Sequence, residues 1–424
     1  MSPHQDSPAL RRTRFSLPHS RRWLIVGLIS LVALINYFDR QSLSIVATRF
    51  QAELHLSDEG YGHVVSLFLL ASAFSYAGAG LLTDWLGTRV SMVLFVGWWS
   101  IAEAMTAFVR SATQLAAARF CLGLGEPGLW VAAPKAVGET LEEKHHSLAI
   151  GIYTLGATVG AVLALPAIAA VTTHLPWKSI FVIDGCAGIL WLPLWLFAFP
   201  KEKQAIAAPR AAAPALSYRT ALKDVLTRAK TWKLMIARGI TDPVWFFYLF
   251  WYPKYLLGAR GLPLARVAQI GWMVYLFAGA GTLIGGVVAG WLIRRGLAPA
   301  LAYRRSMLVY AALIPLSPLA GLAHSALISV SVASVIALAH MAWLITLSST
   351  IIAVFPPLQL GKAFGLIAAG SAFGGLLSTE LVANVVTHHG YLPLFFLMMF
   401  LHPLALALLW TTFKEKPTAM PAAA

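Results

Sequence analysis

The ten residues Gly80-Leu-Leu-Thr-Asp-Trp-Leu-Gly-Thr-Arg89 end one long apolar stretch, residues 61–83, and precede another, residues 90–109. A helix needs about 20 apolar residues to cross the hydrocarbon core of a bilayer. Because only helices and closed barrels satisfy their backbone hydrogen bonds in hydrocarbon, each stretch predicts a membrane-spanning helix. Asp84 and Arg89 are then expected in a tight turn at one membrane surface.

Apolar runs of this kind continue through the whole chain of 424 residues, in which 58% of residues are apolar and 12% are charged. That charged share is about half of the share in soluble proteins, and a soluble chain of this length would need more charge to cover its domains. We therefore predict an all-α polytopic membrane protein with twelve transmembrane helices. The predicted spans are 23–47, 61–83, 90–109, 113–137, 147–171, 177–199, 233–257, 266–293, 306–323, 326–351, 362–386 and 390–413.

The longest polar stretch divides these spans into two groups of six. The segment Gly286-Val-Val-Ala-Gly-Trp-Leu292 resembles residues 80–86 at an offset of 206. Such internal similarity is typical of transporters with two related halves and a binding site between them. The predicted parts are a tail (1–22), a six-helix bundle (23–199), a linker (200–232), a second, pseudo-symmetric six-helix bundle (233–413) and a tail (414–424).

The basic residues predict the orientation of the chain. If the amino terminus is cytoplasmic, the inner tails and loops contain 22 of the 32 Lys and Arg residues, and the outer loops contain five. This bias follows the positive-inside rule and accounts for the net charge of +15 without a nucleic-acid partner. Both termini and the linker are therefore expected in the cytoplasm. A signal peptide is the alternative for the Arg-rich start, but the apolar run that follows it is too long.

Charged residues inside the predicted spans are the candidates for function. Each costs roughly 2.5–3.5 kcal/mol to insert on translocon scales. With a rise of about 1.5 Å per residue, Asp39, Arg40 and Arg119 are expected at similar depth, and Glu126 two turns from Arg119. Arginine binds carboxylates with two hydrogen bonds, so this column predicts an anion site with carboxylates that carry protons. The alternative is an Arg119–Asp39 ion pair that only holds two helices together.

Pro127 follows Glu126 and removes a backbone donor one turn after Gly123. Together with Gly125 and Gly128, it predicts a bend beside a titratable group. Tight helix packing by the glycines is the alternative interpretation. The GxGxxG pattern formed here follows no strand, so it does not indicate a dinucleotide site.

Four segments resemble a known family. Residues 80–89 resemble the loop signature of the major facilitator superfamily. Residues 36–40, 119–128 and 241–255 resemble the first, fourth and seventh helices of its anion:cation symporter family, in particular the bacterial hexuronate and galactonate transporters. The resemblance implies a monomer in the bacterial inner membrane that takes up a sugar acid, such as a hexuronate or aldonate, together with protons by alternating access.

The resemblance also implies roles for particular residues. Asp39 and Glu126 would couple protons, and Asp84 and Arg89 would brace the inner gate. The expected substrate-binding residues are Arg40, Arg119, Tyr37, Tyr76, Trp245, Trp343 and Thr346.

Two departures from the family leave the substrate open. Ser72 stands where relatives have an aromatic residue, with Tyr76 one turn later, and Thr346 stands where they have Asn. A dicarboxylate or aromatic-acid transporter therefore remains an alternative, as does a cation or drug antiporter on the same fold. A sensor that binds without transport is a further alternative.

Neither a metal site nor a cofactor nor an enzyme activity is expected, because Cys121 and Cys186 lie in apolar runs and no nucleophile motif is present. Asp242 is expected to pair with Arg238 four residues earlier. The remaining charged or titratable residues in the spans are assigned to packing, helix ends or a hydrogen-bonded core: Glu103, Asp184, Glu380 and His340.

Overall fold

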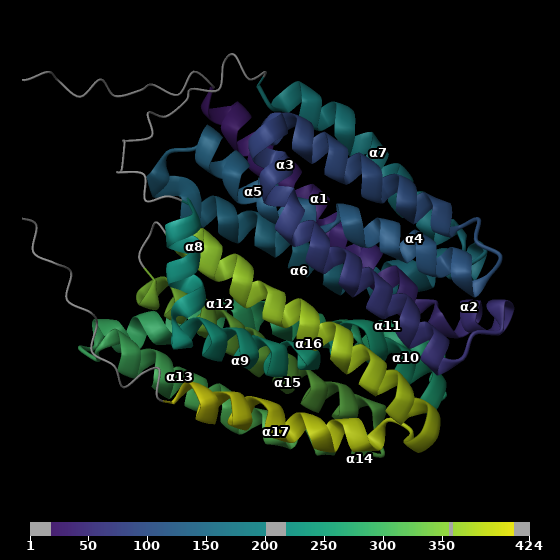
Figure 1. Cartoon of the computed structure of the whole chain (residues 1–424). Coiled ribbons are helices and arrows are strands. Elements are labelled where there is room, and N and C mark those ends of the chain that lie inside the picture. The colour runs from purple at the N-terminus through teal and green to yellow at the C-terminus, as the bar shows by residue number, and fades with distance from the viewer. Residues whose placement is uncertain (1–17, 201–217, 356–358, 411–424) are drawn as a thin grey trace, which may run out of the picture.

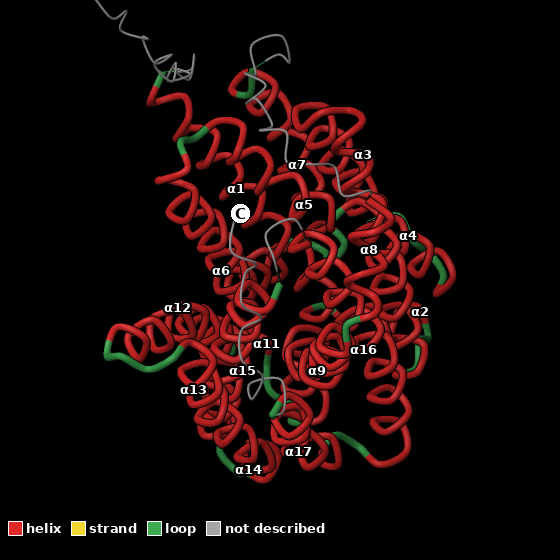
Figure 2. The backbone as a smooth tube through the Cα atoms, turned by 60° about the vertical axis from the view of Figure 1, so that its left-hand side comes forward, coloured by secondary structure: helices red, strands yellow, loops and turns green. Residues whose placement is uncertain are grey.

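The computed structural model describes residues 18–200, 218–355 and 359–410, and these contain helices and no strands. Helices linked by short loops make up both halves (Figure 2). The N-terminal half contains α1 (His19–Ile45), α2 (Ala47–Leu54), α3 (Asp58–Thr106), α4 (Ala112–Gly125), α5 (Pro127–Thr140), α6 (Glu143–His174) and α7 (Ser179–Ala198).

The C-terminal half begins with α8 (Tyr218–Thr227), so the end of the predicted linker is helical. It continues with α9 (Ala229–Phe246), two π-helical segments η2 (Phe247–Trp251) and η3 (Tyr255–Ala259) on either side of α10 (Tyr252–Lys254), α11 (Leu264–Ile270), α12 (Trp272–Arg294), α13 (Pro299–Leu313), a 3₁₀ turn η4 (Ile314–Leu316), α14 (Ser317–Leu322), α15 (Ala326–Val354), α16 (Leu360–His389) and α17 (Leu392–Leu409).

The described residues make twelve passes, as the sequence predicts. Eight helical segments are long and apolar enough to cross a membrane on those grounds alone. The other four passes are the two parts of α3, the continuous pair α4–α5, and α9 with its π-helical extension. The two parts of α3 meet at Gly87, whose φ of 76° and ψ of 159° suit glycine and few other residues. The predicted loop is therefore a sharp turn at one residue.

The two halves form separate bundles that lie side by side (Figure 1). They touch mainly through α3 against α16 and α6 against α12. The ends of α1, α7, α8 and α17 that adjoin the undescribed segments gather at one end of the molecule, here called the tail end (Figure 1). At the opposite end, where α2, α10 and α11 lie, the bundles meet; this is called the closed end.

Within the N-terminal bundle, two glycines bring α6 against the backbone of α1. A methyl group on Gly156 would lie 2.2 Å from the carbonyl oxygen of Ser30, and one on Gly160 would lie 2.2 Å from that of Leu34. Such contacts leave no room for a side chain, and small residues commonly allow this approach in membranes. We call this contact a glycine seam.

The C-terminal bundle contains a matching glycine seam between α16 and α9. Methyl groups on Gly370 and Gly374 would lie 2.2 Å and 2.1 Å from the carbonyl oxygens of Met235 and Gly239. The two glycines are again four residues apart, and they join the corresponding pair of passes. The seams therefore support the pseudo-symmetry that the sequence predicts.

Candidate functional site

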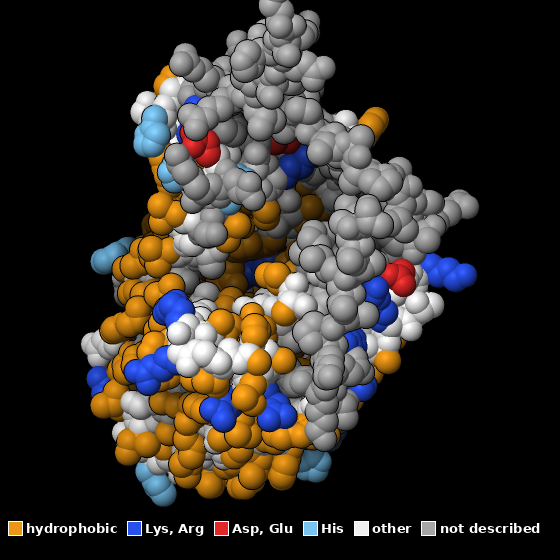
Figure 3. Space-filling model, turned by 90° about the vertical axis from the view of Figure 1, so that its left-hand side faces the viewer, with side chains coloured by type: hydrophobic (Ala, Val, Ile, Leu, Met, Phe, Trp, Pro, Cys, Tyr) orange, Lys and Arg blue, Asp and Glu red, His pale blue; other side chains and the backbone are white. Residues whose placement is uncertain are grey.

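The space between the bundles opens towards the tail end. Viewed onto that end, the surface is hollowed between the two halves, with mostly apolar side chains around the hollow (Figure 3). Deeper between the bundles is a narrow pocket to which both halves contribute. Its lining residues are Arg40, Leu43, Val65, Phe68, Arg119, Leu122 and Phe250.

Aromatic side chains shut this space at the closed end. The hydroxyl of Tyr61 on α3 donates a hydrogen bond of 2.5 Å to the carbonyl oxygen of Phe250 on η2. The ring of Tyr61 also meets the ring of Trp251 edge-on, with centroids 4.9 Å apart, and Phe68 packs against Phe250 at 6.1 Å. Because these contacts join the two halves, they must break for the space to open at this end.

Two ion pairs add to the closure. Lys254 on α10 pairs with Asp58 at the start of α3. His63 and Glu380, on α3 and α16, lie 2.8 Å apart. Both pairs link one bundle to the other near the closed end, so both depend on the present conformation.

The predicted charge column is present, and its first pair is Arg40 with Glu126. The Nε of Arg40 on α1 donates to Oε2 of Glu126 at 2.5 Å. Glu126 is wholly buried, whereas the side chain of Arg40 is 13% exposed. Arg40 also lies over the ring of Tyr37 at 5.6 Å. Glu126 thus pairs with an arginine that also lines the pocket.

Glu126 lies where α4 passes into α5. Its φ of −56° and ψ of −42° are helical, so α5 continues α4 and the predicted bend is only a local interruption. The glycines here pack tightly: a methyl group on Gly123 would lie 2.4 Å from the carbonyl oxygen of Phe68 on α3. The alternative of tight packing therefore describes this segment in the present conformation.

Arg119 pairs with a carboxylate other than Asp39. Its Nη2 lies 3.0 Å from Oε2 of Glu103 on α3 and donates to the hydroxyl of Thr106 at 3.2 Å. The alternative interpretation, an Arg119–Asp39 ion pair, is therefore wrong in its choice of partner. The guanidinium also lies 5.2 Å from the centre of the Phe181 ring, and only 2% of the side chain is exposed.

Asp39 instead belongs to a cluster of three carboxylates with Glu103 and Asp184, contributed by α1, α3 and α7. One oxygen from each lies within 4.8 Å of the others, and the three residues are 1%, 0% and 6% exposed. Ser42 donates to Asp184 at 2.8 Å. Both carboxylate oxygens of Asp39 lack a hydrogen-bond partner among the described residues. Glu103 and Asp184 therefore lie inside the polar site, which their assignment to packing or helix ends missed.

Three of the predicted substrate-binding residues differ in their exposure and in their aromatic neighbours: Tyr37, Tyr76 and Trp245. The ring of Tyr37 meets that of Trp130 edge-on at 6.0 Å. Tyr76 is 42% exposed. Trp245 is partly buried and meets the ring of Tyr275 at 6.2 Å.

Trp343 and Thr346 are completely buried within the C-terminal bundle. The ring of Trp343 packs against His402 on α17 at 5.2 Å. The hydroxyl of Thr346 donates to the carbonyl oxygen of Ala342 at 2.9 Å. Both of these contacts are made within the C-terminal bundle.

Of the two predicted gate residues, Arg89 is the one whose side chain the structure describes. The side chain of Asp84 lies outside the part of the structure that is described. Arg89 donates from Nη2 to the carbonyl oxygen of Leu196 at 2.7 Å and from Nε to that of Phe199 at 3.1 Å. These carbonyls belong to the end of α7, where a helix lacks internal donors, so Arg89 caps α7 within its own bundle.

Asn36 and Trp130 are further members of the site that were not predicted. The indole Nε1 of Trp130 donates to the side-chain oxygen of Asn36 at 3.2 Å, which lies one turn before Arg40. Asn36 is a polar residue in an apolar span, and Trp130 follows Glu126 by one turn, so both carried a signal in the sequence.

The structure also bears on the predictions for Asp242 and His340. Asp242 and Arg238 lie 2.8 Å apart, which confirms the expected pair. His340 is buried, and its Nδ1 lies 3.2 Å from Nε2 of His402, as expected for a hydrogen-bonded core histidine.

Comparison with known proteins adds independent evidence. The sequence model of the Major Facilitator Superfamily matches residues 29–379. The chain is 26% identical to the hexuronate transporter of Escherichia coli K12 over 414 residues, which covers 93% of this chain and 95% of that protein. It is 28% identical to the galacturonate transporter of Dickeya chrysanthemi over 62% of this chain and 80% of that protein.

Solved structures resemble the fold. A bacterial homologue of the human lysosomal transporter Spinster, in an inward-facing conformation, has a TM-score of 0.78 at 19% identity and covers 94% of this chain and 98% of that one. A D-xylose–proton symporter has a TM-score of 0.73 at 14% identity, with coverages of 93% and 99%. At these identities the structures support the fold alone.

Proposed function

This chain belongs to the Major Facilitator Superfamily, and we propose that it transports a sugar acid together with protons across the bacterial inner membrane. The family and its relatives are transporters rather than enzymes. The relatives named above carry hexuronate and galacturonate, and the proposal takes its substrate class from them.

The observation that carries the proposal is the Arg40–Glu126 pair. One guanidinium group faces the pocket and is neutralised from behind by a fully buried carboxylate at 2.5 Å. A substrate carboxylate that binds Arg40 competes with Glu126 for the same positive charge. If Glu126 takes up a proton, Arg40 is free for the anion, so anion and proton bind together. This mutual dependence is the thermodynamic requirement for symport.

The surroundings of Arg40 suit a sugar acid. Tyr37 lies under the guanidinium, and Asn36 and Trp130 lie within a turn of the two charged residues. Hydroxyl, amide and indole groups can bond sugar hydroxyls, and aromatic rings can cover the apolar face of a sugar. A cavity with an anchored arginine disfavours the alternative of a cation or drug antiporter.

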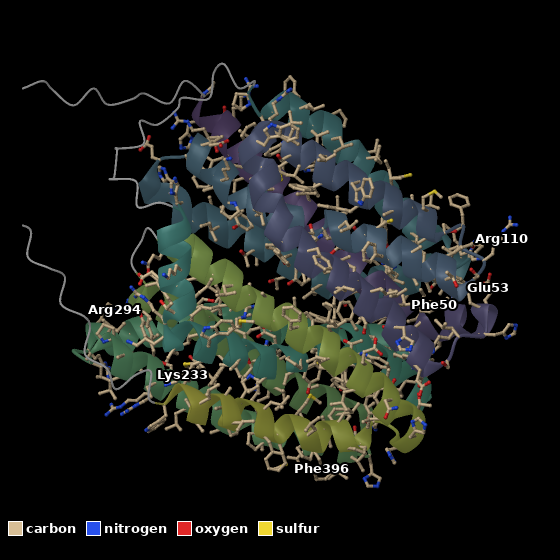
Figure 4. The ribbon with its side chains drawn as sticks, in the orientation of Figure 1. Phe50, Glu53, Arg110, Lys233, Arg294 and Phe396 are labelled. Carbon is tan, nitrogen blue, oxygen red and sulfur yellow. The ribbon has the colours of Figure 1, made fainter. Side chains whose placement is uncertain are left out.

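The orientation belongs to the same proposal. The predicted inner residues Lys233 and Arg294 lie at the tail end, and the predicted outer residues Glu53 and Arg110 lie at the closed end (Figure 4). If the positive-inside rule holds, the hollow in Figure 3 faces the cytoplasm and the structure is inward-facing. Reporter fusions at Ala424 and in the linker test this: alkaline-phosphatase activity at either position would overturn the orientation.

The functional test is uptake into proteoliposomes. Vesicles containing the purified protein are given labelled galacturonate with and without a pH gradient, acidic outside. We expect accumulation only with the gradient and its loss when a protonophore is added. Accumulation that is insensitive to the pH gradient would refute proton coupling.

A thermal-shift screen identifies the substrate in parallel. A ligand at 100 times its dissociation constant stabilises a protein by about 2.7 kcal/mol. Hexuronates and aldonates are compared with dicarboxylates and aromatic acids. Stabilisation by the last two groups alone would favour the alternative substrate classes.

A further inference from the structure

The carboxylate cluster in the N-terminal bundle is not used by the Arg40–Glu126 exchange. Asp39, Glu103 and Asp184 come from three different helices and are all at least nine-tenths buried. In the described part of the chain, Arg119 is the basic side chain that pairs with a member of the cluster, Glu103. Three ionised carboxylates against one guanidinium would leave two negative charges without compensation in a dry interior, an arrangement that proteins avoid by neutralising the group.

We propose that this cluster is a second proton site, in which protonation of Glu103 frees Arg119 to bind the substrate anion. The inference rests on the proposed symport and adds Glu103 and Asp184 to its machinery. It assigns at least two protons to each transport cycle, one at Glu126 and one in the cluster.

The position of Arg119 connects the cluster to the pocket. The guanidinium is held on one side by Glu103 and Thr106. The residue also lines the pocket that Arg40 and Phe250 line, and its Nε has no hydrogen-bond partner among the residues described. When Glu103 is ionised, the positive charge of Arg119 is already neutralised. When Glu103 is protonated, that charge becomes available to an anion in the pocket.

Asp39 provides a second observation that supports a proton in the cluster. Its two carboxylate oxygens have no hydrogen-bond partner within the described ranges, although the residue is 1% exposed. An unpartnered buried acceptor is costly. A proton shared with Glu103 or Asp184, whose oxygens lie within 4.8 Å, provides the missing bond after a small rotation. The cluster is therefore built to hold protons between its members.

Protons suit the cluster better than a metal ion. The oxygen ligands present would suit a hard cation, but Arg119 lies 3.0 Å from Glu103. Its fixed charge would repel a cation placed among the carboxylates. A proton, in contrast, forms a covalent O–H bond on one carboxylate and needs no free coordination shell.

The charged groups that face the cluster set its pH dependence. On α1 these are Asp39 itself and the neighbouring Arg40, which is paired with Glu126 at the α4–α5 junction. Glu103 on α3, Asp184 on α7 and Arg119 on α4 complete the set. Since the carboxylates outnumber the arginines, a rising pH increases the repulsion within the cluster and strengthens the hold of Glu103 on Arg119. Anion affinity should therefore fall as pH rises.

The test uses the full-length protein with galacturonate as the probe. Glu103→Gln keeps the shape of the side chain and mimics its protonated form. Equilibrium binding is measured from pH 5 to 8, and the proton-to-anion ratio is taken from the gradients at which net flux is zero. We expect the slope of log Kd against pH and the transport ratio each to fall by about one, in keeping with the loss of one proton.

A control variant outside the cluster and a second variant within it accompany Glu103→Gln. Asp242→Asn also neutralises a buried acid paired with an arginine, Arg238, but outside the cluster, and should leave both values unchanged. Asp184→Asn retains the hydrogen bond from Ser42 and replaces Glu103→Gln if that variant does not fold. It should lower both values in the same way.

The outcomes separate this inference from the proposed function. If the wild-type protein shows no uptake driven by a pH gradient, the proposed symport fails. If the wild-type protein is driven by the gradient and both cluster variants keep its slope and ratio, the second proton site is refuted. Uptake driven by a sodium gradient at equal pH would also overturn the assignment of protons.

Discussion

Replacing Glu126 by Gln is the most direct perturbation of the proposed anion site. Gln keeps the size of the side chain and can still accept a hydrogen bond from Arg40. It cannot carry the negative charge that neutralises the guanidinium group from behind. The variant should therefore resemble the protonated state of Glu126 at every pH.

The structure indicates how much Glu126→Gln should change the affinity for the anion. The pair is short, at 2.5 Å, and its acid is 0% exposed, so solvent screens it little. A hydrogen bond to a charged group contributes about 1.5–3 kcal/mol and a neutral one about 0.5–1.5 kcal/mol. The substrate would no longer need to displace the difference between the midpoints of these ranges, about 1.25 kcal/mol, which corresponds to roughly eightfold tighter anion binding at neutral or higher pH. At low pH, where the wild-type acid is protonated, the two proteins should bind alike.

Accumulation driven by a pH gradient should fall in this variant, although its affinity for the anion rises. Each coupled proton raises the limiting accumulation about tenfold for one unit of pH gradient, because one pH unit corresponds to about 1.36 kcal/mol. Loss of the proton at Glu126 should lower accumulation by that factor. Exchange of substrate at equal concentrations requires no net proton movement and should persist.

Reconstituted vesicles allow both measurements on one preparation. Counterflow reports exchange, and gradient-driven uptake reports coupling. Full wild-type accumulation in Glu126→Gln would refute the role of Glu126, and Asp39 would become the better candidate. Unchanged anion affinity at high pH would show that Glu126 does not compete with the substrate for Arg40.

Three further predictions concern other parts of the structure. Tyr61→Phe removes the 2.5 Å hydrogen bond to Phe250 and should destabilise the closed-end contact by about 1–3 kcal/mol. Distances between spin labels placed across the closed end should then show more of the open form, and an unchanged distance distribution would contradict a gating role. Gly374→Val places a side chain where even a methyl group would lie 2.1 Å from Gly239, so thermal unfolding should occur at a lower temperature, whereas an unaltered melting temperature would show that the seam adjusts freely. Arg119→Lys keeps the charge but loses the planar fork, so anion affinity should fall at least tenfold; near-normal binding would mean that Arg119 is structural.

The sequence predicts the charged centre well because charges inside membrane spans are rare. Arg40, Arg119 and Glu126 stand out against apolar runs, and their depth follows from the helical rise. The partner of Arg119 could not be chosen in the same way, since depth does not say which side of a helix faces which neighbour. Glu103 lies at a suitable depth on α3, but only the packed bundle shows that it meets Arg119.

The C-terminal half shows the same limit more clearly. α15 contains no Asp, Glu, Lys or Arg, so no charged residue in its sequence indicates which face lines the space between the bundles. Trp343 and Thr346 were expected there, and in this conformation both are completely buried. The π-helical segments after α9 were also not predicted, although Pro253, which lacks a backbone donor and crowds the carbonyl of Leu249 four residues earlier, lies between them.

The two glycine seams allow the halves to be aligned as copies of one ancestral gene. Met235 contacts its seam glycine as Ser30 does in the first half, 205 residues earlier. A contact between two backbones admits no side chain, so it persists while neighbouring positions diverge. Counting from the seam by the same interval, Arg40 corresponds to Trp245.

This alignment suggests how the copies specialised after duplication. The position of Arg40 in one half is occupied by the aromatic residue Trp245 in the other, and the position of Asp39 by Val244. The cluster of three buried carboxylates beside one arginine therefore lies in one half, whereas the buried acid Asp242 in the other half has an arginine of its own.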